Sequence, residues 1–492
     1  ATDDELERIE SVIAHEYFHN WTGNRITCRD WFQLCLKEGL TVFRDQQFSA
    51  EMRGFSMKRI EDVLTLQNRQ FREDDSPLSH PVRPEKYMEI NNFYTATVYE
   101  KGAELVRMLK LIVGSTNYDR ALQQYFSHYD GQACTVEDWL HIFEKTSQIN
   151  LKQFSLWYSQ KGRPRVTVQS SFEDGTFKMN FKQEPGINGN EAAKPMLIPI
   201  TIGLLDRQGI EIRKSRTFLV SQKEQSIKFD GLPSKPIPST LRDFSAPITL
   251  IETMSNHDLK ILARYDPNLF NRWNALRKLS FQAIERFIYD NIPIPNDLLS
   301  IIEHVIMSDD LSHAYRALIA TPPSAHNVLN FCSMLNKPID PFLIHNAINS
   351  FNRNLAQKSQ IFITNFLYEA KPFLEYAPTP EQAGFRAFTL KLLDLHCYCN
   401  SDVANVKKFH ETASNMTDEI NSLILLIKHD KITDELKNFY EKWQSNDNVI
   451  NKWFAAQATY TTPKKAVQVV SKLTKHDFFD KSYVVSNHSF LI

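Results

Sequence analysis

The sequence has little cysteine, no long apolar run and no excess charge of either sign. Six cysteines are spread over 492 residues without a Cys-x-x-Cys pair, which excludes a disulfide scaffold and favours reduced thiols in the cytoplasm. The longest apolar runs, such as residues 423–427, are far shorter than the roughly 18 residues that span a bilayer. With 57 basic and 58 acidic residues, the chain is not expected to bind nucleic acid or a membrane.

Glycine nearly disappears from the second half of the chain. Of the 14 glycines, 13 lie at or before Gly231, and only Gly384 follows. Apolar residues in this second half recur three and four positions apart, as on a packed helix, and residues 311–319 give an example. We therefore expect residues 253–492 to form an all-α, superhelical C-terminal domain that is truncated at the end of the sequence.

Residues 163–252 have the two-residue period of β-strands. Phe177, Met179 and Phe181 alternate with polar residues, and a similar alternation covers residues 198–202. We predict a small antiparallel β-sandwich domain here. Pro199 interrupts the second run, which favours an edge strand because proline cannot donate to a sheet.

The first 162 residues are predicted to be mostly helical. An acidic triplet from Asp3 suits a helix start, and further helices are expected over about 31–52 and 98–113. Thr135 and Asp138 are spaced as a capping box at the start of another helix. The predicted fold class is therefore multidomain α+β, with a mostly helical portion before the β domain and an all-α domain after it.

The segment His15-Glu16-Tyr17-Phe18-His19 carries the strongest chemical signal. On a helix, His15 and His19 lie one above the other and can bind one Zn²⁺. Glu16 would lie beside them, where it could take a proton from a zinc-bound water. The pattern is expected by chance only about 0.03 times in such a chain, so a pair of ordinary core or surface histidines is the weaker explanation.

A catalytic zinc needs a third protein ligand. Glu38 follows His19 at a spacing that places it on the next predicted helix, and it is the candidate. Asp45 lies two turns further along that helix and could accept a hydrogen bond from one zinc-binding histidine, although a surface ion pair explains it equally well. His80 and Arg83 are weak candidates for lining the cleft.

Three motifs together resemble the aminopeptidase N family of zinc peptidases, of the bacterial alanyl aminopeptidase type. They are His-Glu-Tyr-Phe-His-Asn-Trp-Thr-Gly-Asn-Arg at 15–25, Lys-Glu-Gly-Leu-Thr-Val-Phe-Arg-Asp at 37–45, and Asn-Asn-Phe-Tyr-Thr-Ala-Thr-Val-Tyr-Glu-Lys-Gly at 91–102. The order of helical, β and helical parts is also similar. The resemblance implies that residues 1–162 are the zinc-binding part of a thermolysin-like catalytic domain.

The resemblance also implies roles for individual residues. His15, His19 and Glu38 would bind one zinc per chain, with Glu16 as the general base. Tyr99 would donate a hydrogen bond to the oxyanion of the tetrahedral intermediate, a role that the sequence alone does not assign among 17 tyrosines. Tyr94 is a candidate substrate contact.

The implied activity is removal of the N-terminal amino acid from peptides with a free N-terminus, by a monomer. The family binds the substrate ammonium through an upstream Gly-x-Met-Glu-Asn segment, which this sequence lacks, so we expect an internal portion of a larger enzyme. The alternatives are a non-catalytic helical scaffold that keeps the zinc helix, a zinc endopeptidase, or an epoxide-hydrolysing relative.

Overall fold

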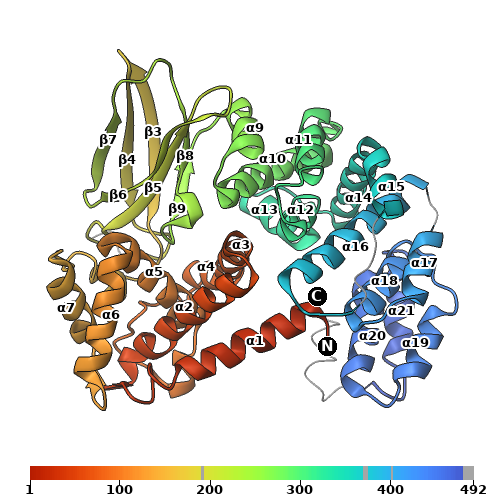
Figure 1. Cartoon of the computed structure of the whole chain (residues 1–492), viewed down its shortest axis with the longest axis horizontal. Coiled ribbons are helices and arrows are strands. Elements are labelled where there is room, and N and C mark those ends of the chain that lie inside the picture. The colour runs from red at the N-terminus through yellow and green to blue at the C-terminus, as the bar shows by residue number, and fades with distance from the viewer. Residues whose placement is uncertain (190–192, 370–374, 401–402, 480–492) are drawn as a thin grey trace. The chain divides into compact units, whose positions relative to one another are not determined.

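The structure is a computed structural model that describes residues 1–189, 193–369, 375–400 and 403–479. These residues form two compact units, coloured from red to blue along the chain in Figure 1. One unit is Glu7–Leu276, and the other combines Ala1–Leu6 with the described residues from Arg277 onward. None of the helices in these ranges has both the length and the apolar character that a bilayer span requires.

The first part of the Glu7–Leu276 unit is helical, as the sequence predicts. Its core includes one face of α5, on which Leu105, Met108 and Leu109 are fully buried. The predicted capping box is present at α7, where Thr135 accepts from the Asp138 backbone and Asp138 from the Thr135 backbone. The helices are α1 (Asp3–Phe18), α2 (Leu34–Arg53), α3 (Phe55–Thr65), α4 (Phe71–Asp74), α5 (Gly102–Val113), α6 (Ser115–Tyr129), α7 (Val136–Ser147) and α8 (Leu156–Ser159).

Shorter elements connect these helices. Two segments widen into single π-helical turns, η2 (Leu66–Gln70) and η4 (Thr97–Lys101). The 3₁₀ segments are η1 (Trp31–Gln33) and η3 (Ile90–Phe93), and β1 (Thr27–Cys28) pairs in parallel with β2 (Ala133–Cys134).

Two small sheets follow in the same unit. One has the strand order β7-β4-β3-β9, and the other has the order β6-β5-β8. The predicted alternation is confirmed, since Phe177, Met179 and Phe181 are all buried. The prediction of purely antiparallel pairing is wrong at β9, which runs parallel to β3. The strands are β3 (Arg165–Glu173), β4 (Thr176–Glu184), β5 (Ile198–Leu205), β6 (Glu211–Val220), β7 (Glu224–Phe229), β8 (Ile237–Thr240) and β9 (Thr249–Glu252), with the 3₁₀ segment η5 (Arg242–Phe244) before β9.

The expectation of an edge strand at Pro199 is also wrong, because β5 is the middle strand of its sheet. Pro199 faces Leu219 of β6 on one side. On the other side β8 pairs with β5 only over Ile202–Leu205. The proline therefore lies where β5 has a single neighbour, so its missing N–H interrupts no ladder with β8.

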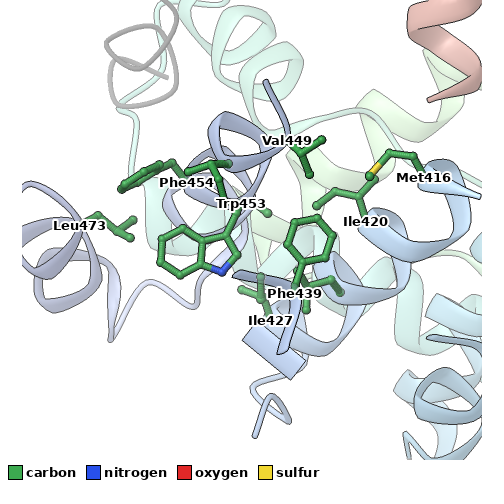
Figure 2. Close-up of a cluster of buried hydrophobic side chains, with 11 residues drawn as sticks. Met416, Ile420, Ile427, Phe439, Val449, Trp453, Phe454 and Leu473 are labelled. Atoms are coloured by element: carbon green, nitrogen blue, oxygen red, sulfur yellow. The ribbon is translucent and has the colours of Figure 1, made fainter. Parts of the chain in front are cut away.

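From residue 256 onward, every element in the described ranges is a helix, which confirms the all-α prediction. Figure 2 shows part of the resulting core, where Phe439, Trp453 and Phe454 pack with aliphatic residues of α18 and with Leu473. The helices are α9 (Asn256–Tyr265), α10 (Leu269–Asp290), α11 (Asn296–Ile306), α12 (His313–Ile319), α13 (Ala325–Met334), α14 (Pro341–Lys358), α15 (Gln360–Glu369), α16 (Pro380–Asn400), α17 (Ala404–Glu411), α18 (Met416–Lys428), α19 (Glu435–Trp443), α20 (Asp447–Tyr460) and α21 (Ala466–Leu473).

Candidate active site

The structure brings the three predicted metal ligands together. His15 lies in the last turn of α1, His19 directly follows that helix, and Glu38 lies on α2. Glu38 Oε2 lies 3.4 Å from His15 Nε2 and 3.2 Å from His19 Nε2. One ligand atom from each residue falls within 4.8 Å of the others. Glu38 is 2% exposed, which is rare for a carboxylate without a positively charged partner.

The Nδ1 atom of each histidine, on the other side of the ring from Nε2, also has a hydrogen-bonding partner. Asp45 Oδ2 lies 2.7 Å from His15 Nδ1, as the sequence suggested. His19 Nδ1 lies 2.9 Å from the carbonyl oxygen of Thr22 and 3.3 Å from the hydroxyl of Thr41. These contacts fix each ring so that Nε2 faces Glu38. The sequence did not single out Thr22, because a contact through a backbone carbonyl leaves no mark on residue identity, and it did not single out the hydroxyl of Thr41.

The charges in this cluster reinforce one another. Burial alone would lower the pKa of His15, but hydrogen bonds to Asp45 and Glu38 raise it to about 9. Burial would raise the pKa of Glu38, yet hydrogen bonds to both histidines and to Lys37 hold it well below its usual range. Lys37 Nζ contacts the second carboxylate oxygen of Glu38 at 3.0 Å. In the absence of a metal, the charge of the Glu38 carboxylate is therefore balanced by the side chains of His15 and Lys37.

Glu16 and Tyr99 lie beside this cluster. Glu16 is exposed on α1 next to His15, and its charge helps to raise the pKa of Tyr99. Burial and the Glu38 carboxylate are the stronger causes of that rise, so the phenol keeps its proton. The Tyr99 ring stacks on the His15 ring with centroids 6.5 Å apart. Tyr94 is 48% exposed, and its ring lies 6.4 Å from that of Tyr99.

Two glycines set the distance between the helices that carry Glu38 and Tyr99. Gly39 follows Glu38 on α2, and Gly102 begins α5 directly after the π-turn that contains Tyr99. A Cβ atom on Gly39 would lie 2.8 Å from the Cα of Gly102, which is closer than real carbon atoms pack. Only glycine allows this approach, and this explains the glycine in both sequence motifs.

The two weak candidates have other contacts. His80 Nδ1 lies 2.7 Å from the carbonyl oxygen of Pro81. Arg83 pairs with Glu137 on α7 at 2.5 Å. These contacts give the two side chains structural partners, and the structure adds no support for a role in the cleft.

The donor set fits a zinc ion. Two imidazole nitrogens and one carboxylate oxygen converge, which is the three-ligand set of a catalytic zinc site with an open position. The engaged Nδ1 atoms of His15 and His19 complete the arrangement that metal-binding histidines usually have.

Comparisons with known proteins agree with this geometry. Residues 1–158 match the peptidase family M1 domain. The chain is also 36% identical to the aminopeptidase N of Haemophilus influenzae over 499 residues, and 36% identical to that of Escherichia coli over 507 residues. The chain therefore contains a peptidase family M1 domain.

The rest of the chain matches two further family models. Residues 162–253 match a domain of unknown function with an Ig-like fold, DUF3458, and residues 256–483 match a domain of unknown function with ARM repeats, DUF3458_C. These descriptions agree with the β-sheets and the helices observed in the two regions.

A solved structure resembles this chain over all of the chain's length. It is the crystal structure of Legionella pneumophila aminopeptidase A in complex with aspartic acid, with a TM-score of 0.84 and 28% sequence identity. The chain covers 57% of that protein. It likewise spans 56% and 57% of the Haemophilus and Escherichia relatives, so it corresponds to little more than half of their length.

Proposed function

We propose that the protein is a zinc-dependent aminopeptidase that hydrolyses the N-terminal amino acid from peptides. The observation that carries this proposal is the convergence of His15, His19 and Glu38 within 4.8 Å. His15 and Glu16 lie on α1, His19 directly follows it, and Glu38 lies on α2. The names of the bacterial relatives, aminopeptidase N, support the choice of reaction.

His15, His19 and Glu38 would hold one zinc per chain. A zinc ion bound by such residues lowers the pKa of water to about 7 and polarises a carbonyl group. Glu16 accepts the proton of the attacking water and passes it to the leaving amine. The phenol of Tyr99 donates a hydrogen bond to the oxyanion, which is typically worth about 3 kcal/mol. Its raised pKa keeps this donor protonated.

The remaining expectations belong to the same proposal. Residues 1–162 would be the zinc-binding part of the catalytic domain, residues 163–252 the β domain, and residues 253–492 the helical domain. The substrates would be peptides with a free N-terminus, and the enzyme would act as a monomer. The six cysteines are free thiols, which favours the cytoplasm as its compartment.

The test is Glu16→Gln in the full-length protein, with zinc content and peptide hydrolysis measured together. The amide keeps the shape of the side chain but cannot accept the proton, so turnover should fall at least about 100-fold while zinc is retained. Glu51→Gln, an exchange of a glutamate at an exposed position on α2, is the control and should leave turnover unchanged. Wild-type turnover in Glu16→Gln would contradict the proposal.

A second comparison separates an exopeptidase from an endopeptidase. The wild-type protein is given one peptide with a free N-terminus and the same peptide with an acetylated N-terminus. An aminopeptidase cleaves only the first, because it must bind the free ammonium group. Equal cleavage of both would assign an endopeptidase instead.

A further inference from the structure

Tyr99 lies in the middle of a π-helical turn, and this wide turn needs an explanation. The turn, η4, covers Thr97–Lys101 and continues directly into α5. A π-turn has i→i+5 hydrogen bonds, is rare, and occurs mostly as a single turn at functional sites. Contacts from other parts of the fold must therefore hold it against relaxation into a regular α-helix.

The first residue of the turn is held by Glu73, in α4. Glu73 Oε2 accepts hydrogen bonds from the backbone N–H of Thr97 at 2.7 Å and from its hydroxyl at 2.6 Å. The side-chain amide of Gln70 donates to the same hydroxyl at 3.3 Å. Thr97 and Gln70 are both fully buried. Backbone N–H groups in a first helical turn lack partners within the helix, and an ionised acceptor binds them strongly.

The last residue of the turn is held by the next residue of α4. Lys101 Nζ donates to Asp74 Oδ2 at 3.1 Å and to the carbonyl oxygen of Gly162 at 2.7 Å. Lys101 is fully buried and Asp74 is 1% exposed. Consecutive acidic residues therefore hold the two ends of the turn, and Tyr99 lies two residues from each end.

The next acidic residue, Asp75, does not contact the turn through the bonds observed. Both of its carboxylate oxygens accept from the guanidinium of Arg163 at 2.9 Å. Glu73, Asp74 and Asp75 thus bind three different partners. A substitution of Asp75 removes a carboxylate from the same segment without removing a contact to the turn, so it serves as the control.

We propose that Glu73 and Asp74, which we call the acidic clamp, are positioning residues that aim the Tyr99 phenol at the oxyanion. The clamp keeps η4 in π geometry. In α geometry each hydrogen bond would span one residue fewer than in the π-turn. This change would rotate Tyr99 about the helix axis, away from His15 and Glu38. The inference rests on the proposed function, because it assumes that Tyr99 donates to the oxyanion.

The first test compares steady-state kinetics and zinc content of full-length variants. Glu73→Ala should lower kcat about 10- to 100-fold with KM and zinc content unchanged, because the lost interaction acts only in the transition state. Glu73→Gln keeps an oxygen acceptor for Thr97 and should recover most of the rate. Asp75→Asn should leave kcat unchanged. Glu73 is chosen because Asp74→Ala would leave the buried Lys101 ammonium unpaired and threaten folding.

A double-mutant cycle with Tyr99→Phe then separates positioning from general damage. If Glu73 acts through Tyr99, Glu73→Ala should have no further effect on the residual kcat of Tyr99→Phe. An equal loss in both backgrounds, or a loss accompanied by reduced zinc content, would overturn the acidic clamp.

The cycle also distinguishes this inference from the proposed function. Wild-type turnover in Tyr99→Phe would overturn both the role of Tyr99 and the clamp that depends on it. Loss of turnover in Tyr99→Phe, together with full activity in Glu73→Ala, would overturn the clamp alone.

Discussion

Gly39 and Gly102 touch backbone to backbone where α2 crosses α5. A Cβ on Gly39 would lie 2.8 Å from the Cα and carbonyl carbon of Gly102, and a Cβ on Gly102 would lie 3.1 Å from the Cα of Gly39. Glu38 precedes the first glycine, and the Tyr99 turn precedes the second. The contact between the two helices therefore fixes the separation of a proposed zinc ligand and the proposed oxyanion donor.

Gly39→Ala should therefore damage both stability and the metal site. The added methyl group meets backbone atoms that cannot rotate away, so the helices must separate, at a cost of about 1–3 kcal/mol. The melting temperature and the zinc content should both fall. Glu51→Ala, at an exposed position on the same helix, is the control. An unchanged melting temperature and zinc content in Gly39→Ala would show that the contact between α2 and α5 tolerates a side chain at this position.

Asp45→Asn should weaken zinc binding without removing a ligand. The carboxylate of Asp45 lies 2.7 Å from His15 Nδ1, and loss of such a partner typically costs about 10- to 100-fold in metal affinity. Competition with a chelator of known affinity measures the change. Asp119→Asn, at an exposed position on α6, should not alter the affinity, and the same affinity in Asp45→Asn would contradict the role of Asp45.

Glu100→Gln should make stability less dependent on pH. Burial raises the pKa of Glu100 from 4.5 to about 7, and the charge of Arg69 only partly opposes this. The folded state therefore binds more protons than the unfolded state between these values, and stability falls as pH rises through them. The cost is complete above pH 7 and is at most about 3 kcal/mol.

Thermal melts at two pH values test this expectation. Glu100→Gln should melt higher than the wild type at pH 8 and at the same temperature at pH 4. Glu61→Gln, whose side chain is 58% exposed, should match the wild type at both values. A lower melting temperature for Glu100→Gln at pH 8 would mean that the charged form of Glu100 stabilises the fold.

The sequence predicted those parts of the fold and site that depend on local spacing. The histidine pair, the capping box at Thr135 and the alternation around Met179 each follow from a helical or strand period. The contact between Asp45 and His15 could also be predicted, because Asp45 lies two turns after Glu38 on a predicted helix and His15 is itself a proposed ligand.

Other features depend on tertiary contacts that no local pattern records. The π-turn around Tyr99 is held by Glu73 and Asp74, which are more than 20 residues earlier in the chain. The place of Pro199 in a middle strand depends on how far β8 extends along β5. The partner of His19 is a carbonyl oxygen, which any residue at position 22 would supply.

The central claim is that this chain builds its own zinc site, and metal content tests it most directly. The purified 492-residue chain is analysed for zinc beside His19→Ala, with circular dichroism to confirm that both are folded. The account predicts about one zinc per wild-type chain and its loss in His19→Ala. A folded wild-type chain that binds no zinc, or a His19→Ala chain that keeps it, would contradict the assignment of His15, His19 and Glu38.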